Sequence, residues 1–253
     1  RGTTLRALLS RHGKLPPELA AAIALEVAAA LGHAHREGIV HRDVKPENVL
    51  VDLAGTSSSP TPAAEREERD HPRVKLTDFG IAKLLDAQGV TSTGQVLGSP
   101  AHMAPEQIEG GDVGPQADVF ALGVLLYESM VGRLPFDGKN PAQVLRRVLD
   151  GAYPPADREL PVVGAQWAAV LARALQRDAS DRYLSVDDFA AAMRAELERV
   201  SMPDGRREIR RFLADQDAYA PTIEPEIVEA LVACGEQARA ASNFRLASNQ
   251  FNR

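Results

Sequence analysis

Apolar residues recur at helical spacing along most of the chain. After Pro16 and Pro17, leucine, isoleucine and valine return every four residues among alanines until Gly38, which predicts one long helix with a buried face. A capping pattern at Ser185 and Asp188 marks the start of a later helix. Further helices are expected near residues 117–131, 141–150, 164–177 and 185–200.

Two short segments, 48–51 and 74–79, have the β-branched character of strands and lie between turn-forming residues. They predict an antiparallel hairpin beneath a cleft. With helices elsewhere, the expected fold class is mainly α (α+β), a helical bundle with short β-hairpins.

Composition changes twice along the chain. Residues 54–72 are rich in serine, threonine and proline and then in charge, so we expect a surface insertion without regular structure. Residues 201–225 contain Pro221 and Pro225 and are expected to form a linker. Residues 226–253 then predict a helix, a short break and a second helix.

The charge and cysteine content exclude several classes of protein. A formal net charge of -6 over 253 residues gives no basic face for nucleic acid. The single Cys234 cannot form an internal disulfide and is expected to be a small core residue, which fits a reducing, cytoplasmic location. The longest apolar run, 119–127, is too short to cross a bilayer, so no membrane segment is expected.

A small set of polar residues has the chemistry needed to transfer a phosphoryl group. Asp43 can accept the proton of a substrate hydroxyl, and Lys45, two residues later, can place a cation against phosphate. Asn48 and Asp78 offer hard oxygen ligands suited to Mg²⁺, and Gly80 allows a sharp turn behind Asp78. The predicted hairpin would bring these ligands to one cleft.

Three motifs carry a resemblance to a known family. The stretches HRDVKPEN at 41–48, DFG at 78–80 and APE at 104–106 occur in this order. The sequence resembles the large lobe of the eukaryotic-like (Hanks-type) serine/threonine protein kinases over residues 1–200, and its composition resembles that of bacterial members. The resemblance implies ATP-dependent phosphorylation of protein serine and threonine, with ATP and Mg²⁺ as cofactors.

The resemblance implies a role for each residue of the catalytic loop. Asp43 would be the catalytic base and Lys45 would contact the γ-phosphate. Asn48 and Asp78 would hold magnesium. Leu50 would lie under the adenine ring.

The resemblance also implies structural roles around this loop. His41 and Phe79 would form the stacked hydrophobic pair of the active state. Asp118 would anchor the catalytic-loop backbone from below. Glu106 and Arg182 would form a buried ion pair at the end of the activation segment.

The activation segment supplies candidate regulatory residues. Arg42 precedes the catalytic aspartate, as in kinases that bind a phosphate on this segment, so Thr91 and Thr93 are candidate phosphorylation sites; three hydroxyl residues in a flexible loop are an equal alternative. Ser99 replaces the usual threonine and keeps its hydroxyl. His102 stands where the family usually has tyrosine.

Other side chains have simpler interpretations. His33 and His35 lie two residues apart on a helix, so their imidazoles do not share a face and a zinc site is not expected. Trp167 is followed by apolar residues at helical spacing and is expected in the core. Glu47 suggests a preference for a basic residue near the acceptor hydroxyl.

The nucleotide cradle of a kinase is missing from this sequence. No glycine-rich phosphate loop, strand lysine or helix glutamate precedes the catalytic loop. The chain begins at Arg1 without a methionine, so we expect a piece of a longer kinase, inactive alone. The alternative is a pseudokinase or scaffold that binds protein partners, for which the tail at 226–253 resembles an incomplete tetratricopeptide (TPR) hairpin.

Overall fold

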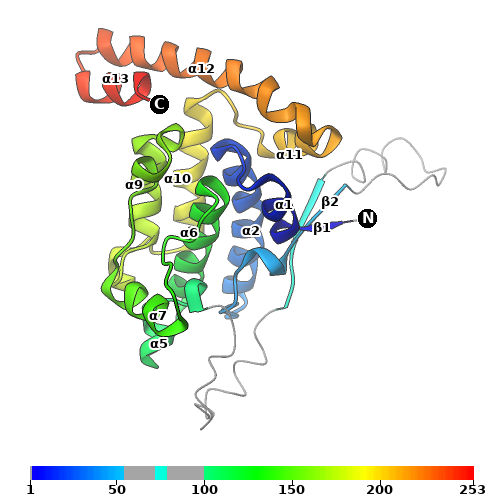
Figure 1. Cartoon of the computed structure of the whole chain (residues 1–253), viewed down its shortest axis with the longest axis vertical. Coiled ribbons are helices and arrows are strands. Elements are labelled where there is room, and N and C mark those ends of the chain that lie inside the picture. The colour runs from blue at the N-terminus through cyan, green and yellow to red at the C-terminus, as the bar shows by residue number, and fades with distance from the viewer. Residues whose placement is uncertain (1, 54–71, 79–99) are drawn as a thin grey trace, which may run out of the picture.

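The computed structural model describes residues 2–53, 72–78 and 100–253. This part of the chain is mainly helical, with one small sheet at the side of the helical bundle (Figure 1). The mainly α fold class expected from the sequence is therefore confirmed. The helices are α1 (Leu5–His12), α2 (Pro17–Arg36), α5 (Pro105–Glu109), α6 (Pro115–Val131), α7 (Pro141–Asp150), α8 (Ala156–Glu159), α9 (Gly164–Ala174), α10 (Val186–Arg199), α11 (Gly205–Ala214), α12 (Gln216–Ala240) and α13 (Phe244–Phe251), with short 3-10 turns η1 (Pro46–Asn48), η2 (Pro100–His102), η3 (Pro161–Val163) and η4 (Ala179–Asp181).

Helix α6 is the centre of the core. All of its residues from 117 to 131 are buried, as expected for a helix that is apolar on every side. Helices α2, α9 and α10 pack around it. The approach of α9 is so close that a Cβ at Gly123 would lie 2.9 Å from the Cβ of Ala174, which leaves room only for glycine.

Helix α2 has the expected start and end. Pro17 occupies the first turn, where its missing N–H costs nothing, and the chain leaves the helix at Gly38 with a φ of 74°. Among the described residues, α2 is the one helix long and apolar enough to cross a membrane, but 72% of that stretch is buried inside the protein. Its apolar residues therefore serve the core.

The expected capping pattern of α10 is present. The Ser185 hydroxyl accepts a hydrogen bond from the Asp188 N–H at 3.1 Å, and the Asp188 carboxylate accepts one from the Ser185 N–H at 3.0 Å. Each side chain thus satisfies a backbone donor that the first turn leaves unpaired.

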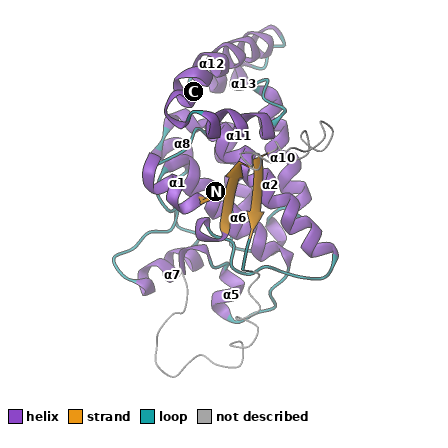
Figure 2. Cartoon of the chain, turned by 90° about the vertical axis from the view of Figure 1, so that its right-hand side faces the viewer, coloured by secondary structure: helices purple, strands orange, loops and turns teal. Residues whose placement is uncertain are grey.

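The predicted hairpin is confirmed. Strand β2 (Val49–Leu53) pairs antiparallel with β3 (Pro72–Leu76), with Val49 opposite Leu76 and Val51 opposite Val74. Strand β1 (Thr3–Thr4) pairs with the other edge of β2, so the order is β1-β2-β3. Figure 2 shows this sheet beside α1 and α2. The predicted insertion at 54–72 lies outside the described residues, except for Pro72, which begins β3.

The prediction of a linker at 201–225 is wrong, because α11 and the first part of α12 occupy most of this segment. Both prolines lie inside α12, where each removes one backbone hydrogen bond. Tertiary packing keeps the helix: Tyr219 and Ile223 are buried, and the Tyr219 hydroxyl donates a hydrogen bond to Glu208 of α11 at 3.1 Å.

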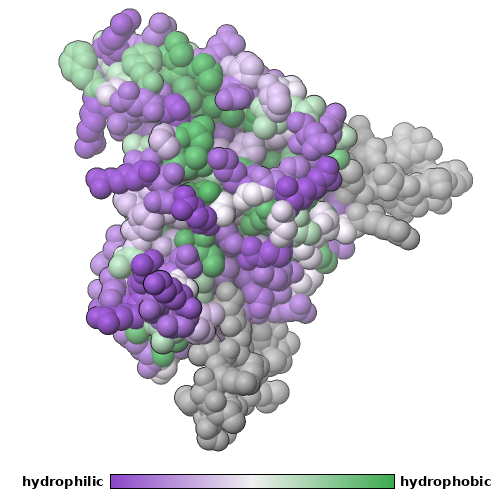
Figure 3. Space-filling model, in the orientation of Figure 1, coloured by the Kyte–Doolittle hydropathy of each residue, from purple (hydrophilic) through white to green (hydrophobic). Residues whose placement is uncertain are grey.

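Helices α12 and α13 form a tight hairpin across one end of the bundle (Figure 1). A Cβ at Gly235 would lie 2.6 Å from the Phe251 ring, so glycine is required where the helices meet. Apolar side chains remain exposed on this tail, including Val228 and Phe244, and green patches appear among the tail helices in Figure 3. A cavity of about 510 Å³ separates α12 from the start of α2.

Candidate active site

The candidate site is formed by the loop between α2 and β2 and by the end of β3. The loop runs from residue 41 to η1, and β3 ends two residues before Asp78. The Thr77 N–H and hydroxyl both donate to the carbonyl oxygen of Asn48, at 2.9 and 3.2 Å. The two predicted metal ligands, Asn48 and Asp78, are therefore held at one end of the hairpin.

Asp118 fixes the backbone of this loop from α6. Its side chain is fully buried, with 0% exposure, and accepts N–H bonds from His41 and Arg42, each at 2.8 Å. His35 Nε2 lies 2.8 Å from Oδ2 of the same carboxylate. A buried carboxylate needs such partners, because an unpaired charge in the core is costly.

Arg42 has a strained backbone with a φ of 65°, which residues other than glycine seldom adopt. Two contacts hold it there. Asp118 binds its N–H, and the Gln107 amide donates to its carbonyl oxygen at 3.1 Å. Strain held from both sides in this way is typical of functional loops, and here it immediately precedes Asp43.

His41 is buried and links the loop to β3. Its Nε2 lies 3.0 Å from the Thr77 carbonyl oxygen, so Nε2 carries the proton, and Nδ1 accepts the Asp43 N–H at 3.2 Å. Burial lowers the pKa of His41 below its usual value and outweighs the opposing effect of the carbonyl and nearby carboxylates. The neutral ring thus positions the backbone of Asp43.

Asp43, Lys45 and Asn48 form a hydrogen-bonded group. Lys45 Nζ donates to Asp43 Oδ2 at 2.7 Å, and Asn48 Nδ2 donates to the same oxygen at 3.1 Å and to the Asp43 carbonyl at 2.9 Å. Two donors on one oxygen fix the orientation of the carboxylate. The sequence predicted these three residues, and the structure brings them together.

The donor set fits magnesium. Asn48 uses its amide nitrogen toward Asp43, which directs its oxygen away from that carboxylate, and Asp78 is exposed at the end of β3 with a φ of 57°. The described residues contain no group of three histidine, cysteine or acidic residues that could form a closed metal site. Magnesium instead takes one or two protein ligands and completes its shell with phosphates and water.

Leu50 lies in the middle of the sheet. Its Cα faces Thr4 of β1 and Lys75 of β3, and its side chain is half-buried. This places an apolar side chain two residues after Asn48, on the central strand. The predicted position under an adenine ring remains a prediction.

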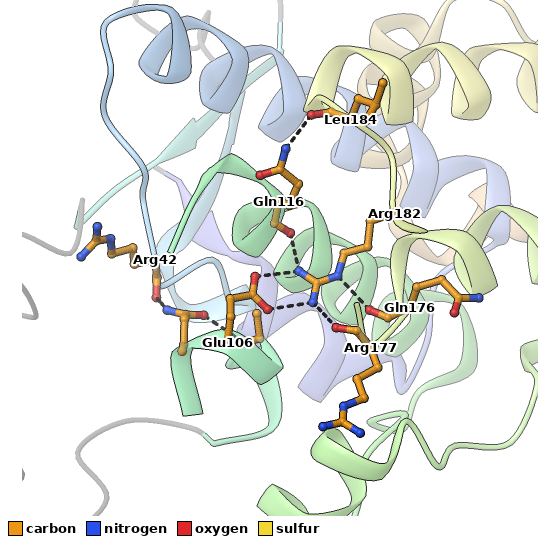
Figure 4. A network of polar contacts seen from close by, with 9 residues as sticks. Arg42, Glu106, Gln116, Gln176, Arg177, Arg182 and Leu184 are labelled. Carbon is orange, nitrogen blue, oxygen red and sulfur yellow. Dashed lines mark hydrogen bonds and ion pairs between the residues drawn. The ribbon is translucent and has the colours of Figure 1, made fainter. Parts of the chain in front are cut away.

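Arg182 and Glu106 form a buried, bidentate ion pair with two N–O distances of 2.8 Å (Figure 4). The Arg182 guanidinium also donates to the carbonyl oxygens of Gln116, Gln176 and Arg177 at 2.8 to 2.9 Å. The guanidinium thus makes five hydrogen bonds within the core. The pair joins α5 to the loop before α10. Its two residues lie 76 positions apart, and the family resemblance had implied that they pair.

Several predicted residues fall outside the described part of the chain. They are Phe79, Gly80, Thr91, Thr93 and Ser99. Their implied roles stay predictions.

The structure also contains a cluster that the sequence did not reveal. Arg6 of α1 contacts Glu47 of the catalytic loop at 2.7 Å and Glu128 of α6 at 2.6 Å. His102 Nε2 lies 3.4 Å from Glu128 Oε2, the oxygen that Arg6 Nη2 also contacts. Because Arg6 and Glu128 are 122 positions apart, no local pattern could have paired them.

Two further residues near the loop were missed. Gln107 supports the strained backbone of Arg42, and it could have been suspected only from its place next to Glu106. His35, considered and rejected as a zinc ligand, instead contacts Asp118. The signal available in the sequence was its place in the last turn of the helix that leads into the loop.

Comparison with known proteins gives a consistent result. The protein kinase domain family matches residues 1–191. Serine/threonine-protein kinase PknL of Mycobacterium tuberculosis is 36% identical over 205 residues, which cover 81% of this chain and 47% of PknL. PrkC of Bacillus subtilis is 32% identical over 216 residues (85% and 30%), and PkaB of Streptomyces coelicolor is 45% identical over 147 residues (58% and 33%). The chain thus spans about half of these relatives' length or less.

Proposed function

This chain belongs to the protein kinase family, and we propose that it provides the large lobe of an active serine/threonine kinase of bacterial type. The reaction would move the γ-phosphoryl group of ATP to a serine or threonine hydroxyl of a protein. The observation that carries the proposal is the bonded group of Asp43, Lys45 and Asn48 beside Asp78.

Asp43 is the proposed general base. Lys45 and Asn48 hold one oxygen of its carboxylate, and His41 holds its backbone N–H. The carboxylate is therefore oriented before substrate arrives, which is the main contribution a protein can make to a reaction that requires positioning. The proton of the substrate hydroxyl would pass to Asp43 as the hydroxyl oxygen bonds to the γ-phosphorus, while the bond from that phosphorus to the bridging oxygen breaks and ADP leaves.

Lys45 has a second proposed role. Its ammonium is held 2.7 Å from Asp43, so it lies beside the oxygen that attacks and can neutralise charge on the transferred phosphoryl group. Asn48 and Asp78 are the proposed Mg²⁺ ligands. When bound, the metal supplies positive charge to the ATP phosphates.

We infer that residues outside these 253 supply the nucleotide cradle. The sequence contains no glycine-rich loop and no strand lysine before Asp43. On this proposal the 253 residues alone do not transfer phosphate. Transfer by the isolated chain that is abolished by Asp43→Asn would contradict this part of the proposal.

The alternative is a scaffold that binds partners without catalysis. The site disfavours this alternative, because the base, the cation and both metal ligands are all present in the sequence. Lys45 and Asn48 are also hydrogen-bonded to Asp43. We propose a binding role only for the tail. The close contact of Gly235 with Phe251 resembles the crossing of a TPR hairpin, which would recruit protein partners in the cytoplasm.

The test is phosphate transfer by the protein expressed from its complete reading frame. Incorporation of radiolabelled phosphate into protein from ATP should fall by at least about 100-fold in Asp43→Asn, the order expected for loss of a general base. Asp112→Asn, an exposed aspartate in a loop, is the matched control and should keep activity. Equal activity of Asp43→Asn and wild type would refute the function.

A further inference from the structure

The cluster around Arg6 contains two carboxylates and one guanidinium. Arg6 Nε binds Glu47 Oε1 at 2.7 Å, and Nη1 and Nη2 bind the two oxygens of Glu128 at 2.6 and 3.3 Å. We call Glu47 and Glu128 the acidic pair. One arginine side chain thus bridges both members of the acidic pair.

Glu128 requires a cation. Its side chain is only 9% exposed. Burial would raise the pKa of Glu128, but His102 and Arg6 outweigh burial and lower it, so the carboxylate is charged. Without Arg6, a buried negative charge would face Glu47, and that arrangement would attract another cation.

The acidic pair lies next to the proposed chemistry. Glu47 is in η1, between Asp43 and Asn48, and it follows Asp43 by four positions, a span of at most about 14 Å. A substrate whose hydroxyl reaches Asp43 therefore carries flanking residues past this point. The side chains of Glu47 and Arg6 are 45% and 34% exposed, so solvent reaches the cluster.

We propose that Arg6 determines substrate specificity by occupying the acidic pair from within the chain. Because the Arg6 guanidinium already binds both carboxylates and offsets one of their two charges, the kinase does not select substrates with a basic residue near the acceptor. The inference rests on the proposed function, in which the substrate is a protein that carries the acceptor serine or threonine. It replaces the expectation, drawn from Glu47 alone, of a preference for basic residues.

Peptide binding tests the proposal without requiring catalysis. Fluorescent peptides would carry one serine in an alanine background and a single arginine at each of the four positions before or after it; matched peptides carry methionine instead. Binding to the protein expressed from its complete reading frame is measured by fluorescence polarisation. Wild type should bind each arginine peptide and its methionine partner within about twofold of one another.

Arg6→Ala should expose the acidic pair. At one or more positions the arginine peptide should bind about tenfold more tightly than its methionine partner, equivalent to about 1.4 kcal/mol. Adding Glu47→Gln to Arg6→Ala should reduce this preference. Arg11→Ala, on the same helix and in an exposed ion pair with Asp217, is the matched control and should behave as wild type.

Three results would overturn the proposal: a tenfold arginine preference in wild type, no gain in a folded Arg6→Ala protein, or no measurable peptide binding by that variant. Thermal unfolding followed by circular dichroism shows whether the variant folds, and Arg6→Met, which keeps the apolar stem, is the second variant. If neither folds, Glu47→Gln decides, because it should leave the wild-type ranking of peptides unchanged. A protein that fails to transfer phosphate refutes the proposed function, while these binding ratios can still be measured.

Discussion

Asp118 shows how one buried side chain can determine the shape of a loop. It accepts backbone N–H bonds from His41 and Arg42 and also contacts His35. These bonds balance the cost of the left-handed backbone at Arg42. The next residue, Asp43, is thereby presented in a fixed direction, which is the requirement for a general base.

His41 predicts a pH dependence of stability. Its pKa is lowered in the folded protein, whereas the unfolded chain takes up a proton near the ordinary value of about 6.5. The contribution of His41 to the free energy of unfolding is therefore complete above about pH 6.5 and declines as the pH falls through and below that value. Protonation of Nδ1 would also break the bond from the Asp43 N–H.

An NMR titration of the histidine rings checks this prediction. The His41 ring should remain neutral at pH values below the ordinary histidine pKa of about 6.5. Denaturant unfolding at pH 7.5 and 5.5 should show a smaller pH effect in His41→Phe than in wild type. Protonation of the His41 ring at or above about pH 6.5 would show that His41 is not buried as described.

Site residues that belong to a sequence motif could be predicted. Site residues that are distant in the sequence and meet only in the folded chain could not. Asp43, Lys45 and Asn48 lie within a stretch of six residues, so the sequence alone allowed their chemistry to be predicted together. Arg6 comes from α1 and meets Glu128 of α6, 122 positions away, only in the folded chain. The sequence therefore suggested the charge of Glu47 but not the arginine that binds it.

At the scale of elements, the ion pair of Arg182 and Glu106 ties α5 to the loop before α10. The Arg182 side chain has 0% exposure and that of Glu106 has 17%. Burial of both charges offsets much of their attraction, so the pair stabilises one arrangement of these elements more than it adds free energy. Removing only one partner is nevertheless costly.

Arg182→Met should lower the free energy of unfolding by about 3–5 kcal/mol, because Glu106 and three carbonyl oxygens lose their donor. Arg177→Met is the control. Arg177 pairs with Glu109 on the surface, with both side chains at least half exposed, so its loss should cost about 1 kcal/mol or less. Urea unfolding followed by circular dichroism measures both, and equal losses would contradict the account.

Local sequence signals located most elements but failed where tertiary contacts overrode them. The hairpin of β2 and β3 and the helices α2, α6, α7 and α10 were predicted from apolar periodicity and caps. Pro221 and Pro225 wrongly suggested a connector, because the buried Tyr219 and Ile223 hold α12 together across both prolines. Proline signals a break only when packing does not compensate for the lost hydrogen bonds.

At the scale of the whole molecule, the catalytic loop and the tail lie at opposite ends of α2. The loop follows the C-terminal end of this helix, and α11 and α12 lie near its start. A helix of 20 residues spans roughly 30 Å. The tail is therefore remote from Asp43, and partners bound there would not compete directly with a substrate.

The most direct test of the central claim is magnesium-dependent formation of phosphoserine or phosphothreonine by the protein expressed from its complete reading frame. Mass spectrometry would identify the modified residues after incubation with ATP. We predict transfer in wild type only when Mg²⁺ is present, and a loss of at least about 100-fold in Asp78→Asn. Transfer that persists in Asp78→Asn, or that occurs without divalent metal, would contradict the account.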